Sequence, residues 1–345
     1  MSDTAMSDTA TSMLLDLPLH VGGPDARAAA RFLAESGVDG AYSFEGPNDV
    51  FVPLARAAGE DIDLYSNIAV SFPRSPVHLA HTAWDLNRLT NGRFMLGLGS
   101  QVRAHVERRF GAEFSHPAAR MADQVDAIKA VFASWQNGAP LNHQGRFWKL
   151  DLMPPLFVPG PLEWGPPPVL VAAVGPKMTE VAVRHADGIL LHPFTSTNYV
   201  RATTLPAIEA AGRPDGFIVV GGAIAAIASD VMDQSAADDA ARGLVAFYGS
   251  TPAYRPVLDA EGHGDLQPEL RTLTRAGRWA EMSSLIDDTV LSSIVLRGDS
   301  ASVASQLVER YGTDVGRVAV TIPHAIDQAA VASLAEAVGR DRPTI

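Results

Sequence analysis

The sequence contains no cysteine in its 345 residues. Disulfide bonds, thiolate metal sites and cysteine nucleophiles are therefore excluded. It also lacks any run of about 18 apolar residues, so we expect no membrane-spanning helix and no membrane partner. Positive charge is scarce: 27 lysines and arginines stand against 39 aspartates and glutamates, which gives a net charge of −12. This balance argues against general nucleic-acid binding, because nucleic acid is held by a basic surface.

We expect no secretory signal at the N-terminus of this sequence. Residues 1–12 (MSDTAMSDTATS) are polar. A signal peptide needs a basic stretch followed by an apolar one, and these residues contain neither. We expect a disordered tail over residues 1–12 and a cytoplasmic protein. Hydrophobic residues make up 47% of the chain, enough for one large core, so residues 13–345 are predicted to form a single domain.

Several catalytic signatures are also missing. There is no GxGxxG dinucleotide fingerprint, no GxxxxGK[ST] phosphate loop and no GxSxG nucleophile elbow. A metal-dependent hydrolase barrel would have two close histidines after its first strand, where this chain has only His20. We therefore predict no metal site and no serine nucleophile.

The organisation that is present is an alternation of apolar strand-like runs with amphipathic helical segments. Such an alternation is typical of parallel βα units in an α/β protein. The predicted strands span residues 13–19, 38–43, 62–70, 94–98, 169–174, 188–191, 217–227 and 318–322. Eight strands favour a (β/α)8 TIM barrel with insertions after strands 4 and 7, and a doubly wound open sheet is the alternative.

The strand over residues 94–98 ends in small residues and then opens onto polar side chains. Gly97 and Gly99 are expected to clear space there, and Ser100, Gln101 and His105 follow. Catalytic side chains of α/β barrels gather at the carboxyl ends of strands, so this stretch is a candidate wall of an active site. A tight turn before a solvated helix would have the same composition.

A second strand end, at residues 174–180 (VGPKMTE), begins a helix. The first amides of a helix lack partners and carry the positive end of its dipole, so they bind phosphate groups. Gly175 lets a ligand approach the backbone, Pro176 suits a first helical position, and Lys177 adds a charge. A plain βα turn with a good helix start is the alternative. His192 follows the next predicted strand and could line the same mouth.

These motifs together resemble the luciferase-like monooxygenase superfamily. The matching segments are residues 73–76 (PRSP), 91–94 (NGRF), 96–100 (LGLGS), 175–177 (GPK) and 186–188 (ADG). Within the superfamily the chain looks most similar to the coenzyme F420-dependent oxidoreductases. The resemblance implies a barrel that carries a deazaflavin, coenzyme F420, or alternatively FMN, across the carboxyl ends of its strands.

The resemblance also implies where the phosphate of that cofactor binds. It would lie after strand 5, beyond Val174, on the amides of Gly175, Pro176, Lys177 and Met178.

For the cofactor ring, the resemblance implies a bulge at the end of strand 3. The family has a non-prolyl cis peptide bond there, which the alignment places near Ile68 and Ala69. Ser100 and Gln101 would form the neighbouring wall.

The catalytic residues of the family do not carry over. The F420-dependent members have a histidine after strand 2, where this chain has Glu45, and a glutamate after strand 4, where it has Gln101 and Val102. We therefore take Glu45, His105 and His192 as the candidates for proton transfer.

Three functions are consistent with the sequence. The first is hydride transfer between F420 and a small organic substrate. The second is an FMN-dependent two-component monooxygenase, and the third is a barrel that binds a flavin or deazaflavin without turnover. We expect loops 44–52, 140–168 and 249–290 to shape the substrate pocket. The family also favours homodimers, so we expect one here.

Overall fold

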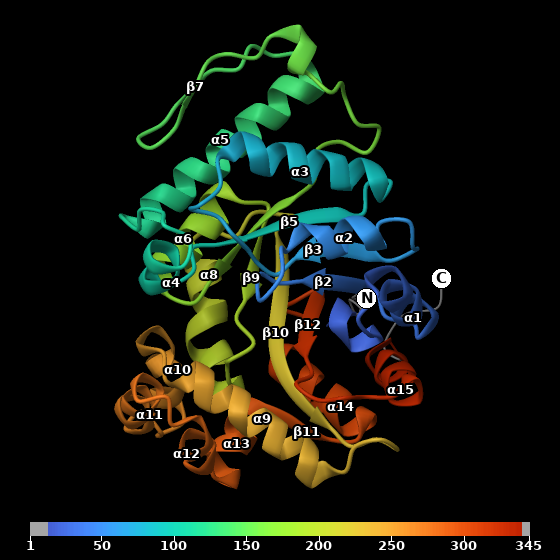
Figure 1. The fold of residues 1–345 in the computed structure, drawn as a ribbon, viewed down its shortest axis with the longest axis vertical. Helices are drawn as coiled ribbons and strands as arrows, with labels where there is room; N and C mark the ends of the chain where they lie inside the picture. The colour runs from blue at the N-terminus through green and yellow to red at the C-terminus, as the bar shows by residue number, and fades with distance from the viewer. Residues whose placement is uncertain (1–12, 340–345) are drawn as a thin grey trace, which may run out of the picture.

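The computed structural model describes residues 13–339, in which parallel strands close into a barrel (Figure 1). The predicted disordered tail, residues 1–12, lies outside the described residues. The barrel strands are β1 (Leu14–Pro18), β2 (Gly40–Ser43), β3 (Asp63–Ser66) with its continuation β4 (Ala69–Val70), β5 (Phe94–Gly99), β8 (Val169–Ala173), β9 (Gly188–Leu191), β10 (Ile218–Ile227) and β12 (Arg317–Thr321). The (β/α)8 prediction is confirmed and the open doubly wound alternative is wrong.

The ring closes between strands that are far apart in the sequence. Each strand pairs with the next from β1 round to β9, β9 pairs with β10, and β10 pairs with β12. Parallel pairing of β12 with β1, with Arg317 opposite Leu14, completes the circle. All carboxyl ends of the barrel strands therefore meet at one mouth.

Helices cover the outside of the barrel and begin where the sequence supplies caps. Ser75 accepts the amide of His78 at the start of α3, where Pro76 occupies the first turn, and Asp25 caps α1 in the same way. These helices are α1 (Ala26–Glu35), α2 (Phe51–Ala57), α3 (Pro76–Leu89), α6 (Pro176–His185), α7 (Thr197–Tyr199), the π-helix η3 (Val200–Thr204), α8 (Leu205–Ala210), α14 (Ser300–Tyr311) and α15 (Gln328–Gly339). A short 3₁₀ helix, η1 (Leu19–Gly22), follows β1.

The first insertion follows β5 and lies at the upper end of Figure 1. Its longest element packs on α3, and its small hairpin projects beyond both. The elements are α4 (Arg103–Arg108), α5 (Pro117–Asn137), β6 (His143–Gln144), β7 (Lys149–Leu150) and the 3₁₀ helix η2 (Pro155–Phe157). The carboxylate of Asp123 on α5 anchors the hairpin by accepting the amide of Trp148 and by pairing with His143 at 2.6 Å.

The second insertion follows β10 and lies at the lower end of Figure 1. It consists of α9 (Gln234–Gly249), η4 (Pro252–Tyr254), α10 (Arg255–Ala260), α11 (Leu266–Arg275), α12 (Trp279–Ser284), α13 (Asp288–Ile294) and β11 (Val295–Gly298). Its helices enclose a hydrophobic cluster of their own, which includes Phe194 from the barrel mouth. The strand β11, which the sequence pattern did not predict, extends the sheet beside the outer half of β10.

The interior of the barrel is mostly apolar but contains a cluster of ionisable side chains on β1, β3 and β12. Asp16 accepts a hydrogen bond from the Tyr65 hydroxyl at 2.8 Å and lies 3.2 Å from Arg317 Nε. Arg317 also pairs with Asp63. Burial raises the pKa of Asp16 to about 7, although Arg317 and the Tyr65 hydrogen bond oppose the rise and the neighbouring carboxylates of Asp63 and Asp39 add to it.

Candidate functional site at the barrel mouth

The predicted site residues lie on the loops and helices that follow the strands at their carboxyl ends. Glu45 follows β2, Ile68 and Ala69 lie at the junction of β3 and β4, and Ser100 and Gln101 follow β5. Residues 174–178 follow β8, His192 follows β9, and His105 lies on α4. The barrel topology thus directs all of them towards the same mouth, although their side chains differ in what they contact.

The third strand is interrupted by a non-prolyl cis peptide bond between Asn67 and Ile68. The resemblance placed this bond near Ile68 and Ala69, one residue later. Gly97 and Gly99 were expected to clear space at the mouth, but that space is filled by the interrupted strand itself. A Cβ on Gly97 would lie 1.9 Å from the Ser66 carbonyl oxygen, and one on Gly99 would lie 2.6 Å from the Ile68 side chain.

Glu45 is held in a buried ion pair that braces this interruption. Its carboxylate accepts from both terminal nitrogens of Arg74, at 2.7 and 2.9 Å, and from the Val70 amide at 2.7 Å. Only 6% of the Glu45 side chain is exposed. Through these contacts Glu45 holds the interrupted strand in position. Proton transfer by Glu45 remains a prediction.

The residues after β5 are turned towards their own backbone. The Gln101 side chain accepts the amide of Val102 at 2.9 Å, and the Ser100 hydroxyl donates to the Gln101 carbonyl at 3.3 Å. Gln101 adopts a left-handed backbone with φ 55°. Val102, at the position of the family glutamate, is exposed. Within residues 13–339, the imidazole of the exposed His105 makes no hydrogen bond, ion pair or ring contact.

The turn from β8 into α6 has the features of an anion site. Gly175 precedes the helix without a side-chain cap, the first turn contains no acidic residue, and a Cβ on Gly175 would meet no atom within 4 Å. Two parts of the prediction need correction. Pro176 has no amide hydrogen to donate, and the Met178 amide already donates to the Gly175 carbonyl. The amides of Gly175 and Lys177 and the exposed Lys177 ammonium remain as donors.

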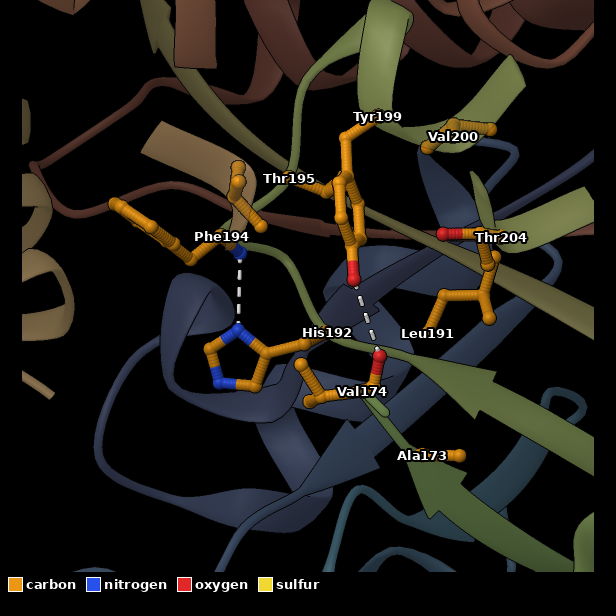
Figure 2. Close-up of a pocket in the computed structure, with 10 residues that line it drawn as sticks. Ala173, Val174, Leu191, His192, Phe194, Thr195, Tyr199, Val200 and Thr204 are labelled. Carbon is orange, nitrogen blue, oxygen red and sulfur yellow. Dashed lines mark hydrogen bonds between the residues drawn. The ribbon is translucent and has the colours of Figure 1, made fainter. Parts of the chain in front are cut away.

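His192 lies in a small pocket beside this turn (Figure 2). The Phe194 amide donates to its Nδ1 atom at 3.1 Å, which assigns the imidazole proton to Nε2. Burial lowers the pKa of His192 to about 3, so the ring is neutral at physiological pH. Gly222 on β10 allows the chain at His192 to approach, because a Cβ there would lie 2.3 Å from the Leu191 carbonyl oxygen.

Two tyrosines that the sequence did not single out surround His192. Tyr254 stacks on its ring with centroids 4.3 Å apart, and Tyr248 meets it edge-on at 4.8 Å. Both come from the second insertion, on α9 and η4, so neither follows a barrel strand directly. The only available signal was the expectation that loop 249–290 shapes the pocket, and this loop contains Tyr254 but not Tyr248. We call His192, Tyr248 and Tyr254 the His192 cluster.

Residues 13–339 contain neither a clustered metal site nor a helix that could cross a membrane. No group of three or more histidine or acidic side chains in this part of the chain is placed to hold a metal ion. None of the helices described there is both long and apolar enough to span a bilayer.

Comparison with known proteins identifies relatives of the whole barrel. A protein of Mycobacterium tuberculosis that is uncharacterized is 40% identical over 300 residues, which cover 85% of this chain and 88% of the relative. A putative coenzyme F420-dependent oxidoreductase of the same organism is 25% identical over 313 residues, covering 83% and 87% of the two chains. Among solved structures, the coenzyme F420-dependent tetrahydromethanopterin reductase of Methanopyrus kandleri superposes with a TM-score of 0.76 at 20% identity, covering 94% of this chain and 97% of its own.

The sequence profile of one family covers nearly all of the barrel, from residue 14 in β1 to residue 316 just before β12. The match agrees with the closed barrel, the interrupted third strand and the glycines that accommodate it. The chain therefore belongs to the luciferase-like monooxygenase family.

Proposed function

We propose that this luciferase-like oxidoreductase binds coenzyme F420 and transfers hydride between that deazaflavin and a small organic substrate. The observation that carries the proposal is the uncapped start of α6, which opens at the barrel mouth with free amides at Gly175 and Lys177. Such a helix start attracts a phosphate group, which F420 and FMN both contain. The relative named as a putative F420-dependent oxidoreductase favours F420.

The residues present fit such a cofactor. The open space beside Gly175 and the absence of an acidic residue in the first turn of α6 suit an anion. Ile68 and Ala69, at the interruption of the third strand, would lie against the cofactor ring, and the Glu45–Arg74 pair keeps this segment in place. Bound F420 would supply a hydride from its C5 atom, while the protein supplies orientation and electrostatics.

We expect F420 to bind with a dissociation constant in the micromolar range or tighter. Lys177→Gln should weaken binding roughly fivefold, since one charge-assisted contact to phosphate contributes about 1 kcal/mol. Fluorescence titration of the purified chain with F420 measures this, and Lys149→Gln, on the exposed hairpin strand β7, is the matched control. The control should retain the affinity of the parent chain.

The same titration distinguishes the alternatives. Tight binding of FMN with no binding of F420 would favour the monooxygenase that the family name describes. Binding of a cofactor without turnover on a broad panel of small organic substrates would favour a non-catalytic barrel. Dissociation constants above roughly 100 μM for both cofactors would contradict the proposal. A cytoplasmic location remains a prediction.

We also propose a homodimer that forms through the first insertion. Five large apolar side chains are between 48% and 87% exposed on this insertion and at the adjacent end of α3. They are Leu89, Leu152, Leu156, Phe157 and Trp164. Sedimentation should give about twice the chain mass of 36.5 kDa, because several large exposed apolar side chains on one insertion suit an interface.

Leu156→Asp combined with Phe157→Asp should then shift the protein towards monomer. Val231→Asp replaces an equally exposed apolar residue, 58% exposed, on the other side of the barrel after β10, and should leave the mass unchanged. A monomeric parent chain at tens of micromolar would disprove the homodimer.

A further inference from the structure

The His192 cluster presents polar atoms that have no protein partner and are open to solvent. No hydrogen bond within residues 13–339 uses His192 Nε2 or the hydroxyls of Tyr248 and Tyr254. None of the three is among the enclosed side-chain atoms that lack a partner, so each is accessible. A ligand could therefore bind to any of these atoms without displacing an existing contact.

The protonation states within the cluster are fixed. The Phe194 amide occupies His192 Nδ1, so Nε2 is a permanent donor, and the low pKa of His192 keeps the ring from becoming an imidazolium. Burial raises the pKa of Tyr248 and of Tyr254, and the neighbouring Tyr248 adds to the rise for Tyr254. Both phenols therefore stay neutral and can donate. The cluster is an uncharged set of hydrogen-bond donors.

The pocket on one side of His192 lacks charge, although neither Tyr248 nor Tyr254 lines it. The pocket that adjoins His192 is lined, among the described residues, by apolar, hydroxyl and aromatic side chains and by no acid, lysine or arginine. An anionic ligand would lose its hydration there without gaining a counter-ion. An ammonium ligand would need the aromatic faces, but His192 already covers a face of Tyr254, and Tyr248 packs against both rings. An uncharged acceptor suits the pocket best.

The cluster continues towards the barrel axis. Burial raises the pKa of Tyr42 on β2, and the nearby Tyr248 adds to this rise. The Tyr42 hydroxyl donates to the Val320 carbonyl at 3.2 Å. Phe194, which is 1% exposed, anchors the His192 loop in the hydrophobic cluster of the second insertion. The donors are therefore held rigidly between the barrel and the insertion, as selective binding of a small ligand requires.

We propose that the His192 cluster binds the carbonyl oxygen of an uncharged substrate, with His192 Nε2 and the Tyr248 hydroxyl as the two donors. Tyr254 orients the imidazole by stacking on it. The second insertion thereby determines the substrate class, because it supplies both tyrosines. This inference rests on the proposed function, since it names the substrate class of the same mouth.

The first test measures binding by the full chain of three probes of equal ring size, with and without F420. Cyclohexanone should bind at least tenfold more tightly than cyclohexanecarboxylate or cyclohexylammonium in calorimetry. His192→Leu and Tyr248→Phe should each weaken cyclohexanone binding about fivefold to tenfold, since each removes one donor. His192→Gln should restore part of the affinity, because its amide can donate from a similar position. Phe157→Leu, at an exposed aromatic position of the first insertion, is the matched control.

The second test reads the imidazole directly. In ¹⁵N-histidine spectra, the signal that disappears in His192→Gln should show the Nε2–H tautomer, should stay neutral down to about pH 5 and should shift when cyclohexanone is added. An imidazolium signal at pH 6, a proton on Nδ1, or equal binding of the carboxylate probe would overturn the inference. Failure of both F420 and FMN to bind would instead overturn the proposed function. In that case, the binding of cyclohexanone without cofactor still tests the His192 cluster.

Discussion

Gly97→Ala is expected to destabilise the protein by about 3 kcal/mol or more, or to prevent its folding. The added Cβ would lie 1.9 Å from the Ser66 carbonyl oxygen and 2.7 Å from the Leu190 side chain. Backbone cannot yield as a side chain can, so β3 or β5 would have to move. The hydroxyl of Ser66 holds the two strands together by donating to the Gly97 carbonyl and accepting from its amide. Urea unfolding of the two proteins measures the difference.

Gly175→Ala is the matched control, because a Cβ there meets nothing within 4 Å. It should change the free energy of unfolding by less than about 0.5 kcal/mol. If Gly97→Ala does not fold, Gly99→Ala with and without Ile68→Ala tests the same packing. A Cβ added at Gly99 would clash with the outer atoms of Ile68 at 2.6 and 2.7 Å, so the second substitution should relieve part of the loss. Full stability of Gly97→Ala would refute this account of the interrupted strand.

The free energy of unfolding should contain a component that falls as the pH rises from about 4 to 8, and Asp16 should be its source. The pKa of this carboxyl is about 7 in the folded protein and 3.8 for the free side chain, because burial opposes its charge. The folded state therefore holds the proton more tightly than the unfolded state. The resulting stabilisation is complete below about pH 4 and is lost as the pH rises through about 7. A shift of about three pH units corresponds to at most about 4 kcal/mol.

Asp16→Asn should remove this component and flatten the dependence of stability on pH. Unfolding in urea at pH 5 and pH 8 gives the slope for each protein, and Asp215→Asn, an exposed position, controls for the loss of one carboxylate. The variant can be less stable at pH 5, since its amide must fit beside Gly40, where the Asp16 carboxylate now lies. The informative quantity is the slope, and equal slopes for Asp16→Asn and the parent chain would rule out a neutral Asp16.

The sequence was sufficient for the barrel because each βα unit carries local signals. The apolar run over residues 188–191 predicted the bounds that β9 has in the structure, Gly188–Leu191. The strand β11 was missed because it is short and follows directly on a helix. It is a strand only because β10 extends past the barrel and offers it an edge.

The candidate site was predictable only in part. The turn at Gly175 could be predicted because the start of a helix, with its free amides, is recognisable from consecutive residues in the sequence. Tyr248 and Tyr254 contact His192 from positions more than fifty residues later in the chain, and no spacing rule connects residues across an insertion. Gly97 and Gly99 showed that something must approach β5, but only the folded chain identifies Ser66 and Ile68 as the neighbours.

The closing pair of strands also determines when the barrel can close during its synthesis. β1 needs β12 as its second neighbour, and Leu14 pairs with Arg317 near the opposite end of the chain. Until the ribosome has produced β12, the edges of β1 and β10 both remain open to other strands. Chains that stop before residue 317 should therefore aggregate, and the nascent protein should depend on chaperones until the last strand has emerged.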